Sequence, residues 1–215
     1  MPKPDLMLPT LEASALKHII CENLEEAFRQ IQKPDVNLVV CPRTVEQSIA
    51  SFIQLVYLSP FHPVSLAANQ GLVREQLSEG LSDYISLHIE GAFQLIEDMV
   101  MLTNLFIKLT KRSQTQLLLQ TVENDACRKF HVDLYPIRLI CTYDGPGTQW
   151  LPNHQANREA LQTINEQITK DPRNIQNMGS FHVGIMKGNQ TNYGIVHRSP
   201  PIKEQGLKRF VFRLD

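Results

Sequence analysis

The fold is decided by one stretch of the sequence, FHVDLYPIRLICTYDGPGTQWLP, which runs from Phe130 to Pro152. Within it, the apolar and β-branched run 137–143 is typical of a buried strand, and the following Asp144-Gly-Pro-Gly147 is typical of a turn. Ahead of that strand, His131 and Asp133 stand two residues apart, and such side chains project from the same face of an extended segment. Both could therefore reach one metal ion, although an H-x-D triplet also arises by chance and is weak evidence alone.

Short apolar segments separated by Gly, Pro and Asn continue on both sides of this stretch, from about residue 113 to the end of the sequence. The pattern predicts strands near 117–122, 137–143, 181–186, 194–197 and 207–214, and a short helix near 158–168. Spaced strands with turn signals are typical of an antiparallel sandwich or barrel.

The first half of the sequence has helical periodicity instead. Apolar residues recur every three or four positions and predict helices over 11–31, 44–58, 69–81 and 83–111. We therefore expect an α+β fold, in which a helical region, residues 1–112, packs on a β-core, residues 113–215, as one compact unit. The helical region could be a lid, a support or a homodimer interface, and periodicity does not distinguish these roles.

Further motifs follow the H-x-D triplet in a fixed order. They are the turn 144–147, the segment Gly184-Ile-Met-Lys-Gly188, the segment Val196-His197-Arg-Ser-Pro200, and a last strand with Arg209 near its start. This succession resembles the double-stranded β-helix of Fe(II)- and 2-oxoglutarate-dependent oxygenases over roughly residues 113–215. The resemblance implies a jelly-roll or cupin-like core with Fe(II) and 2-oxoglutarate as cofactors.

The same resemblance implies that His131, Asp133 and His197 are the metal ligands. Two neutral imidazoles and one carboxylate hold a divalent iron from one side. The remaining coordination positions are then open to a chelating 2-oxo acid and to dioxygen.

Arg209 stands where the oxygenase pattern has a basic residue, and Arg213, on the same strand face, is the less favoured alternative. Arginine suits the far carboxylate of the oxo acid, because its planar guanidinium donates two parallel hydrogen bonds and stays charged. Tyr143 or Thr148 could add a hydroxyl to the same carboxylate. Trp150 could stack on the substrate, although a role in anchoring the core is favoured.

A narrower resemblance comes from six segments taken together. These are FHVD, IRLICTYDGPGTQWLP, NREAL, MKG, VHRSPP and RFVFRLD, and they look like the bacterial family called domain of unknown function 1826. That family has no established activity, so the resemblance supports the fold and the site without naming a substrate. The sequence departs from well-studied oxygenases where Gly145-Pro-Gly147 replaces a Gly-Gly pair.

The leading hypothesis is an oxygenase that hydroxylates or demethylates an unidentified small molecule or protein. One alternative is a non-catalytic metal-binding protein of the same fold, acting in metal handling or sensing. A weaker alternative is a cupin-like metalloenzyme without 2-oxoglutarate, which would need a fourth ligand such as His182.

Composition narrows the class of protein. The 215 residues carry a formal net charge of −1, which does not favour a nucleic-acid partner. No apolar run approaches the roughly 20 residues that span a bilayer, and the start lacks a secretion signal, so we expect a cytoplasmic protein without a membrane partner. Four scattered cysteines without a C-x-x-C pair are expected to be reduced.

Overall fold

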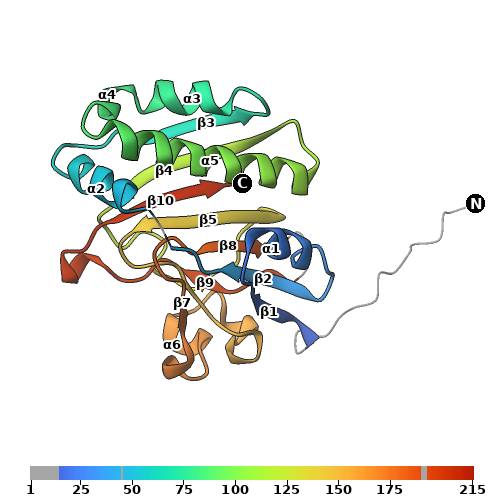
Figure 1. Cartoon of the computed structure of the whole chain (residues 1–215). Coiled ribbons are helices and arrows are strands. Elements are labelled where there is room, and N and C mark those ends of the chain that lie inside the picture. Colours follow the sequence, from blue (N-terminus) through green and yellow to red (C-terminus); the bar gives the residue numbers. More distant parts are fainter. Residues whose placement is uncertain (1–14, 45, 190–192) are drawn as a thin grey trace, which may run out of the picture.

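A computed structural model describes residues 15–44, 46–189 and 193–215 of the chain (Figure 1). Its largest element is a seven-stranded sheet with the order β1-β2-β8-β5-β10-β4-β3, in which β1 is parallel to β2 and the other pairs are antiparallel. A smaller sheet has the order β7-β6-β9. The strands are β1 (Lys17–Ile20), β2 (Val36–Cys41), β3 (Val64–Asn69), β4 (Gln114–Val122), β5 (Ile137–Asp144), β6 (Gln149–Trp150), β7 (Gln176–Asn177), β8 (Val183–Lys187), β9 (His197–Arg198) and β10 (Arg209–Leu214).

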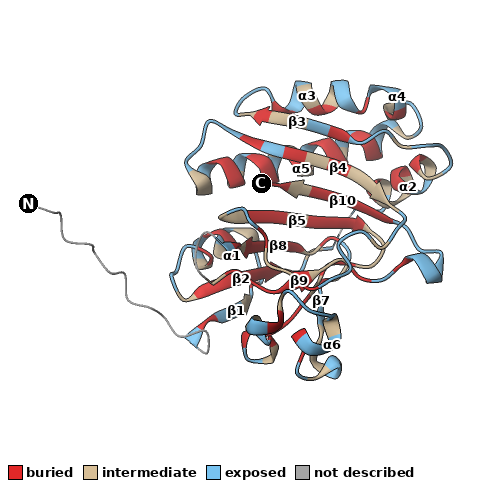
Figure 2. Ribbon diagram, turned by 180° about the vertical axis from the view of Figure 1, so that it is seen from behind, coloured by how far each residue is buried: buried red, intermediate tan, exposed pale blue. Residues whose placement is uncertain are grey.

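Helices cover one face of the large sheet, and the views from front and back show α5 running across it (Figures 1 and 2). The Nδ1 atom of His88 caps the start of α5 by accepting a hydrogen bond from the Gly91 amide at 3.0 Å. Buried side chains of α1, α2, α3 and α5 join those of the sheet in the main hydrophobic core. The α-helices are α1 (Leu24–Gln30), α2 (Gln47–Val56), α3 (Val73–Gly80), α4 (Ser82–Ile85), α5 (Ile89–Thr110) and α6 (Asn165–Ile168).

The opposite face of the large sheet is covered in part by the smaller sheet. Leu38 and Val40 of β2 and Met186 of β8 pack there against Trp150 of β6 and against Ile195. All six residues of β2 are buried, because both faces of this strand are covered.

The alternation of side chains along β5 and β10 sorts polar from apolar residues. The residues on the helix side belong to the main core and are Leu139, Cys141, Tyr143, Phe210, Phe212 and Leu214. The residues on the other side that line a cavity are Arg138, Ile140, Arg209, Val211 and Arg213. Two neighbouring strands therefore give one wall of this cavity several arginines.

The mixed α+β class predicted from the sequence is confirmed, whereas the secondary structure of the first half differs from the prediction. The predicted helix over 11–31 is wrong at 17–20, where β1 lies; α1 occupies only 24–30, and residues 11–14 lie outside the described residues. The strands β2 and β3 were not predicted at all. Short apolar runs such as Ile19-Ile20 fit a helical stripe and a strand equally well, and here pairing with β2 decides between them.

The helices in the described ranges include none with the length and apolar character needed to cross a lipid bilayer.

Candidate metal centre

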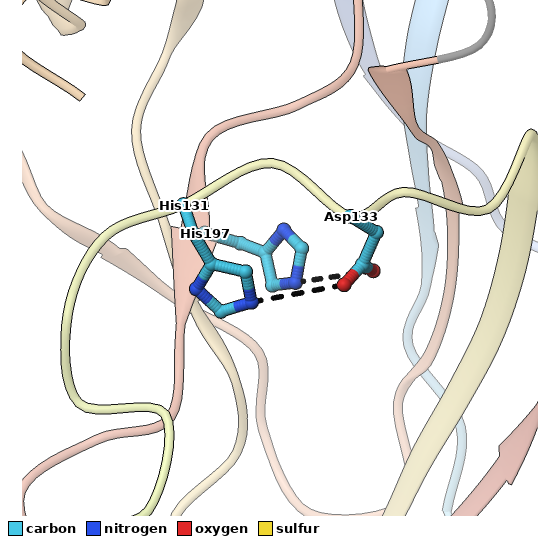
Figure 3. A group of neighbouring side chains, drawn as sticks. All are labelled: His131, Asp133 and His197. Carbon is cyan, nitrogen blue, oxygen red and sulfur yellow. Dashed lines mark ion pairs between the residues drawn. The ribbon is translucent and has the colours of Figure 1, made fainter. Parts of the chain in front are cut away.

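Backbone pairing brings His131 and His197 together, although they are far apart in the sequence. The His131 amide donates to the carbonyl of His197 at 3.0 Å, and the His197 amide donates to the carbonyl of His131 at 2.9 Å. The two imidazole rings lie 4.6 Å apart between centroids. Asp133, two residues after His131, directs its carboxylate toward both rings (Figure 3).

The three side chains offer their ligand atoms to one point. Nε2 of His131 lies 3.7 Å from Oδ1 of Asp133, and Nε2 of His197 lies 3.3 Å from Oδ2 of the same carboxylate. One ligand atom from each residue falls within 4.8 Å of the others, so a single ion could contact all three. The described residues thus place the H-x-D pair and the distal histidine of the sequence analysis side by side.

Hydrogen bonds to the backbone orient both imidazoles. Nδ1 of His131 lies 2.8 Å from the Lys129 carbonyl, and Nδ1 of His197 lies 3.1 Å from the Ile195 carbonyl. A carbonyl only accepts, so each Nδ1 carries the proton and each Nε2 can present its lone pair to the centre. Burial lowers the pKa of His197 to about 4, which keeps this imidazole neutral near pH 7.

The carboxylate of Asp133 is ionised inside the protein. Burial opposes ionisation, but His131, His197 and Arg138 outweigh it and lower the pKa of Asp133 to about 2. Oδ1 accepts a hydrogen bond from Nη1 of Arg138 at 2.6 Å, while the buried Oδ2 accepts none from any described residue. Two imidazole nitrogens and an unpartnered carboxylate oxygen make a donor set that fits Fe(II).

Arg209 lies in the wall of the cavity that also contains His131 and His197. It is only 2% exposed, and burial lowers its pKa to about 10, so it remains a cation. The guanidinium donates to three neutral hydroxyls, on Ser199 at 3.0 Å, Thr142 at 3.1 Å and Thr148 at 3.4 Å, and its Nε has no partner among the described residues. A buried cation with only neutral partners is costly unless an anion joins it.

Arg213 also lines this cavity, but its charge is compensated. Its side chain is one-third exposed and its Nε pairs with Oδ2 of Asp215 at 2.9 Å. The structure therefore separates two arginines that the sequence left as alternatives: of the two, Arg209 is the cation without an acidic partner.

Several residues of the site were missed by sequence reasoning. Arg138, Thr142 and Ser199 were not named, although Arg138 and Thr142 alternate with the core residues of β5 and so share one face of the strand. This period of two was a usable signal. The contact of Ser199 with Arg209 depends on tertiary pairing and has no local signal.

Tyr143 and Trp150 are placed away from the cavity wall. Tyr143 projects from the helix side of β5, where its hydroxyl donates to Oδ2 of Asp98 at 2.5 Å. Trp150 is 3% exposed and packs on His18 with ring centroids 4.6 Å apart, within the core between the two sheets. The strand register puts Thr142 rather than Tyr143 beside Arg209, and Trp150 anchors the core.

If the cavity takes the 2-oxoglutarate expected from the sequence, Tyr143→Phe should leave its binding within twofold of the wild type. The same change should lower the free energy of unfolding by about 2 kcal/mol, because the hydrogen bond to the half-buried carboxylate of Asp98 is lost. Urea unfolding and calorimetric titration measure the two effects. Thr142→Val, one residue earlier on the same strand, is the matched control and should weaken binding of that co-substrate instead. Weaker binding in Tyr143→Phe with wild-type binding in Thr142→Val would contradict this placement.

Comparisons with known proteins give a family and distant structural likenesses. A family model described as "Protein of unknown function (DUF1826)" matches residues 23–215. None of the curated proteins matches the chain. A protein of Shewanella oneidensis provisionally assigned as an oxygenase is 14% identical, with a TM-score of 0.46 over 93% of this chain and 89% of that chain.

Two further solved structures are similar at still lower TM-scores. A full-length Neurospora crassa protein, in complex with alpha-KG and 5-formyluracil, is 9% identical, with a TM-score of 0.40 over 88% of this chain and 76% of that chain. SnoK, a non-heme alpha-ketoglutarate-dependent carbocyclase from nogalamycin biosynthesis, is 11% identical, with a TM-score of 0.36 over 89% of this chain and 83% of that chain.

Proposed function

The chain belongs to the family DUF1826, and because the description of that family assigns no activity, we propose from the site itself that the protein is a non-haem Fe(II)- and 2-oxoglutarate-dependent oxygenase. His131, Asp133 and His197 would hold the iron from one side. The chemistry that the bound group supplies is the oxidation of a substrate C–H bond by O₂, as in hydroxylation or demethylation, coupled to the decarboxylation of 2-oxoglutarate.

The observation that carries the proposal is the buried, uncompensated guanidinium of Arg209 in the same cavity as the two histidines. A 2-oxo dicarboxylate has a chelating end for a metal and a second carboxylate for a cation. Arg209, held by Thr142, Thr148 and Ser199, offers that cation with its donors already oriented. A protein that only handled metal would have no use for this cation, so the non-catalytic alternative is less well supported.

The apolar residues of the cavity have a role in this proposal. Leu118, Ile140 and Val211 line the space together with the arginines. By excluding water they strengthen the attraction between Arg209 and a carboxylate, since charges interact more strongly where the local dielectric constant is low.

A double-stranded β-helix is part of the proposal, and the path of the chain supports it. From β4 onward the chain enters the large sheet with β4, β5, β8 and β10, and in between enters the small sheet with β6, β7 and β9. The bridge from His131 to His197 adds a further pairing beside β9. Repeated passage between two sheets is the pattern of a jelly roll, and it puts His197 on the small sheet, His131 beside it and Arg209 on the large sheet.

The weaker alternative, a cupin-like enzyme with a fourth protein ligand, has no support at His182. Nδ1 of His182 accepts a hydrogen bond from the Gly179 amide at 3.0 Å, and this residue is not in the group around Asp133.

A cytoplasmic location is part of the proposal as well. The four cysteines are free thiols, which fits a reducing compartment.

The test is an anaerobic titration. Protein loaded with one equivalent of Fe(II) should develop a weak visible charge-transfer band as 2-oxoglutarate is added, with saturation near one equivalent. Succinate lacks the chelating oxo group and is the matched control, which should give no band. Bound iron without a band in the wild type would overturn the oxygenase assignment and leave non-catalytic metal binding.

A further inference from the structure

A row of alternating charges extends from Asp133 to the residue that follows β10. Nη1 of Arg138 donates to Oδ1 of Asp133 at 2.6 Å, and Nε of the same guanidinium donates to Oδ1 of Asp215 at 2.5 Å. We propose that Arg138 and Asp215 are positioning residues, which hold Asp133 so that it binds the metal through Oδ2 alone. This inference rests on the metal centre proposed above.

The two carboxylate oxygens of Asp133 have different surroundings. Oδ1 is occupied by Arg138, whereas Oδ2 is buried, accepts no hydrogen bond from a described residue and lies 3.3 Å from Nε2 of His197. A carboxylate that could turn freely would offer a metal either oxygen or both. The bond to Arg138 removes that choice and keeps one more coordination position open for small ligands.

Asp215 can serve as the fixed end of the row because its main chain is tied to β4. Its amide donates to the Gln116 carbonyl at 3.0 Å, and its carbonyl accepts from the Gln116 amide at 3.2 Å and from Oγ1 of Thr115 at 2.7 Å. The side chains of Asp215 and Arg138 are 4% and 11% exposed. A rigid sheet, rather than a loop, therefore sets the direction of the guanidinium.

Charge and position make opposite predictions for Arg138. The positive charge of Arg138 partly neutralises Asp133 and repels a metal cation. By charge alone, Arg138→Gln should therefore bind metal more tightly. If Arg138 instead acts by holding the carboxylate in place, the same change lets Asp133 turn and weakens metal binding. Outer partners of metal ligands are commonly worth about 10–100-fold in metal affinity.

The experiment measures Co(II) affinity by competition with a chelator, together with the visible d–d spectrum of the bound Co(II), which depends on its coordination. Arg138→Gln and Asp215→Asn should each weaken binding about tenfold or more and change the spectrum. Arg138→Lys should weaken binding too, because an ammonium group keeps the charge but lacks the fork that joins two carboxylates. Asp171→Asn removes a carboxylate from an exposed ion pair with Arg173 and should change neither readout.

Wild-type affinity and spectrum in both Asp215→Asn and Arg138→Lys would overturn the inference, and so would tighter binding by Arg138→Gln. Unfolding midpoints of the metal-free variants are measured in parallel. If Arg138→Gln does not fold, the other two variants decide, since Asp215→Asn keeps the side-chain volume and Arg138→Lys keeps the charge. His131→Ala distinguishes the proposed metal centre from the proposed positioning role. If His131→Ala loses the metal while the Arg138 and Asp215 variants bind it as the wild type does, the metal centre is retained and the positioning role is rejected.

Discussion

His131→Ala should abolish stoichiometric Fe(II) binding while the protein stays folded. The group around Asp133 offers three ligands, and two are too few to hold a divalent iron when the rest must come from water. We expect a loss of more than about a hundredfold in affinity, since the loss of an outer partner alone costs about 10–100-fold. Anaerobic equilibrium dialysis followed by metal analysis gives the number of ions bound.

The fold should tolerate this change because the His131 side chain is 36% exposed and its pairing with His197 uses main-chain atoms. Far-UV circular dichroism and the unfolding midpoint of the apoprotein check that expectation. His154→Ala, at an exposed histidine of the same half, is the matched control and should bind one Fe(II). One tightly bound iron in His131→Ala would mean that the metal lies elsewhere.

The three candidate ligands could be predicted from the sequence to different degrees. That His131 and Asp133 could reach one metal ion was predicted from their spacing alone, because side chains two residues apart in an extended segment face the same side. His197 has no local pattern that would mark it. It enters the site through antiparallel pairing with His131, and only the resemblance to a family predicted its place beside His131 and Asp133.

The strands of the first half could not be found from periodicity. Residues 17–20 and 36–41 are short, and β2 is buried on both faces, so apolar residues fall at nearly every position and carry no period. The row from Asp133 to Asp215 was missed for another reason. Arg138 meets Asp215, which is 77 positions away in the sequence, and a pairing at such a separation is set by the sheet order.

Arg209→Ala should remove 2-oxoglutarate binding and leave metal binding intact. The guanidinium is a buried cation in the cavity wall with no acidic partner among the described residues, and truncating one member of a buried charge pair costs about 2–5 kcal/mol. A loss of about 3 kcal/mol is more than a hundredfold in affinity. In the anaerobic titration the charge-transfer band should then fail to saturate at concentrations that saturate the wild type.

The stability of Arg209→Ala distinguishes a ligand-binding cation from a structural one. A buried charge that only contacts hydroxyls destabilises the ligand-free protein, so its removal should leave the unfolding midpoint unchanged or raise it. Arg213→Ala is the matched control, because Arg213 lines the same cavity but is paired with Asp215, and 2-oxoglutarate affinity should change less than about threefold. A large loss in Arg213→Ala with wild-type binding in Arg209→Ala would reverse the assignment, because the carboxylate would then be bound at the far end of β10.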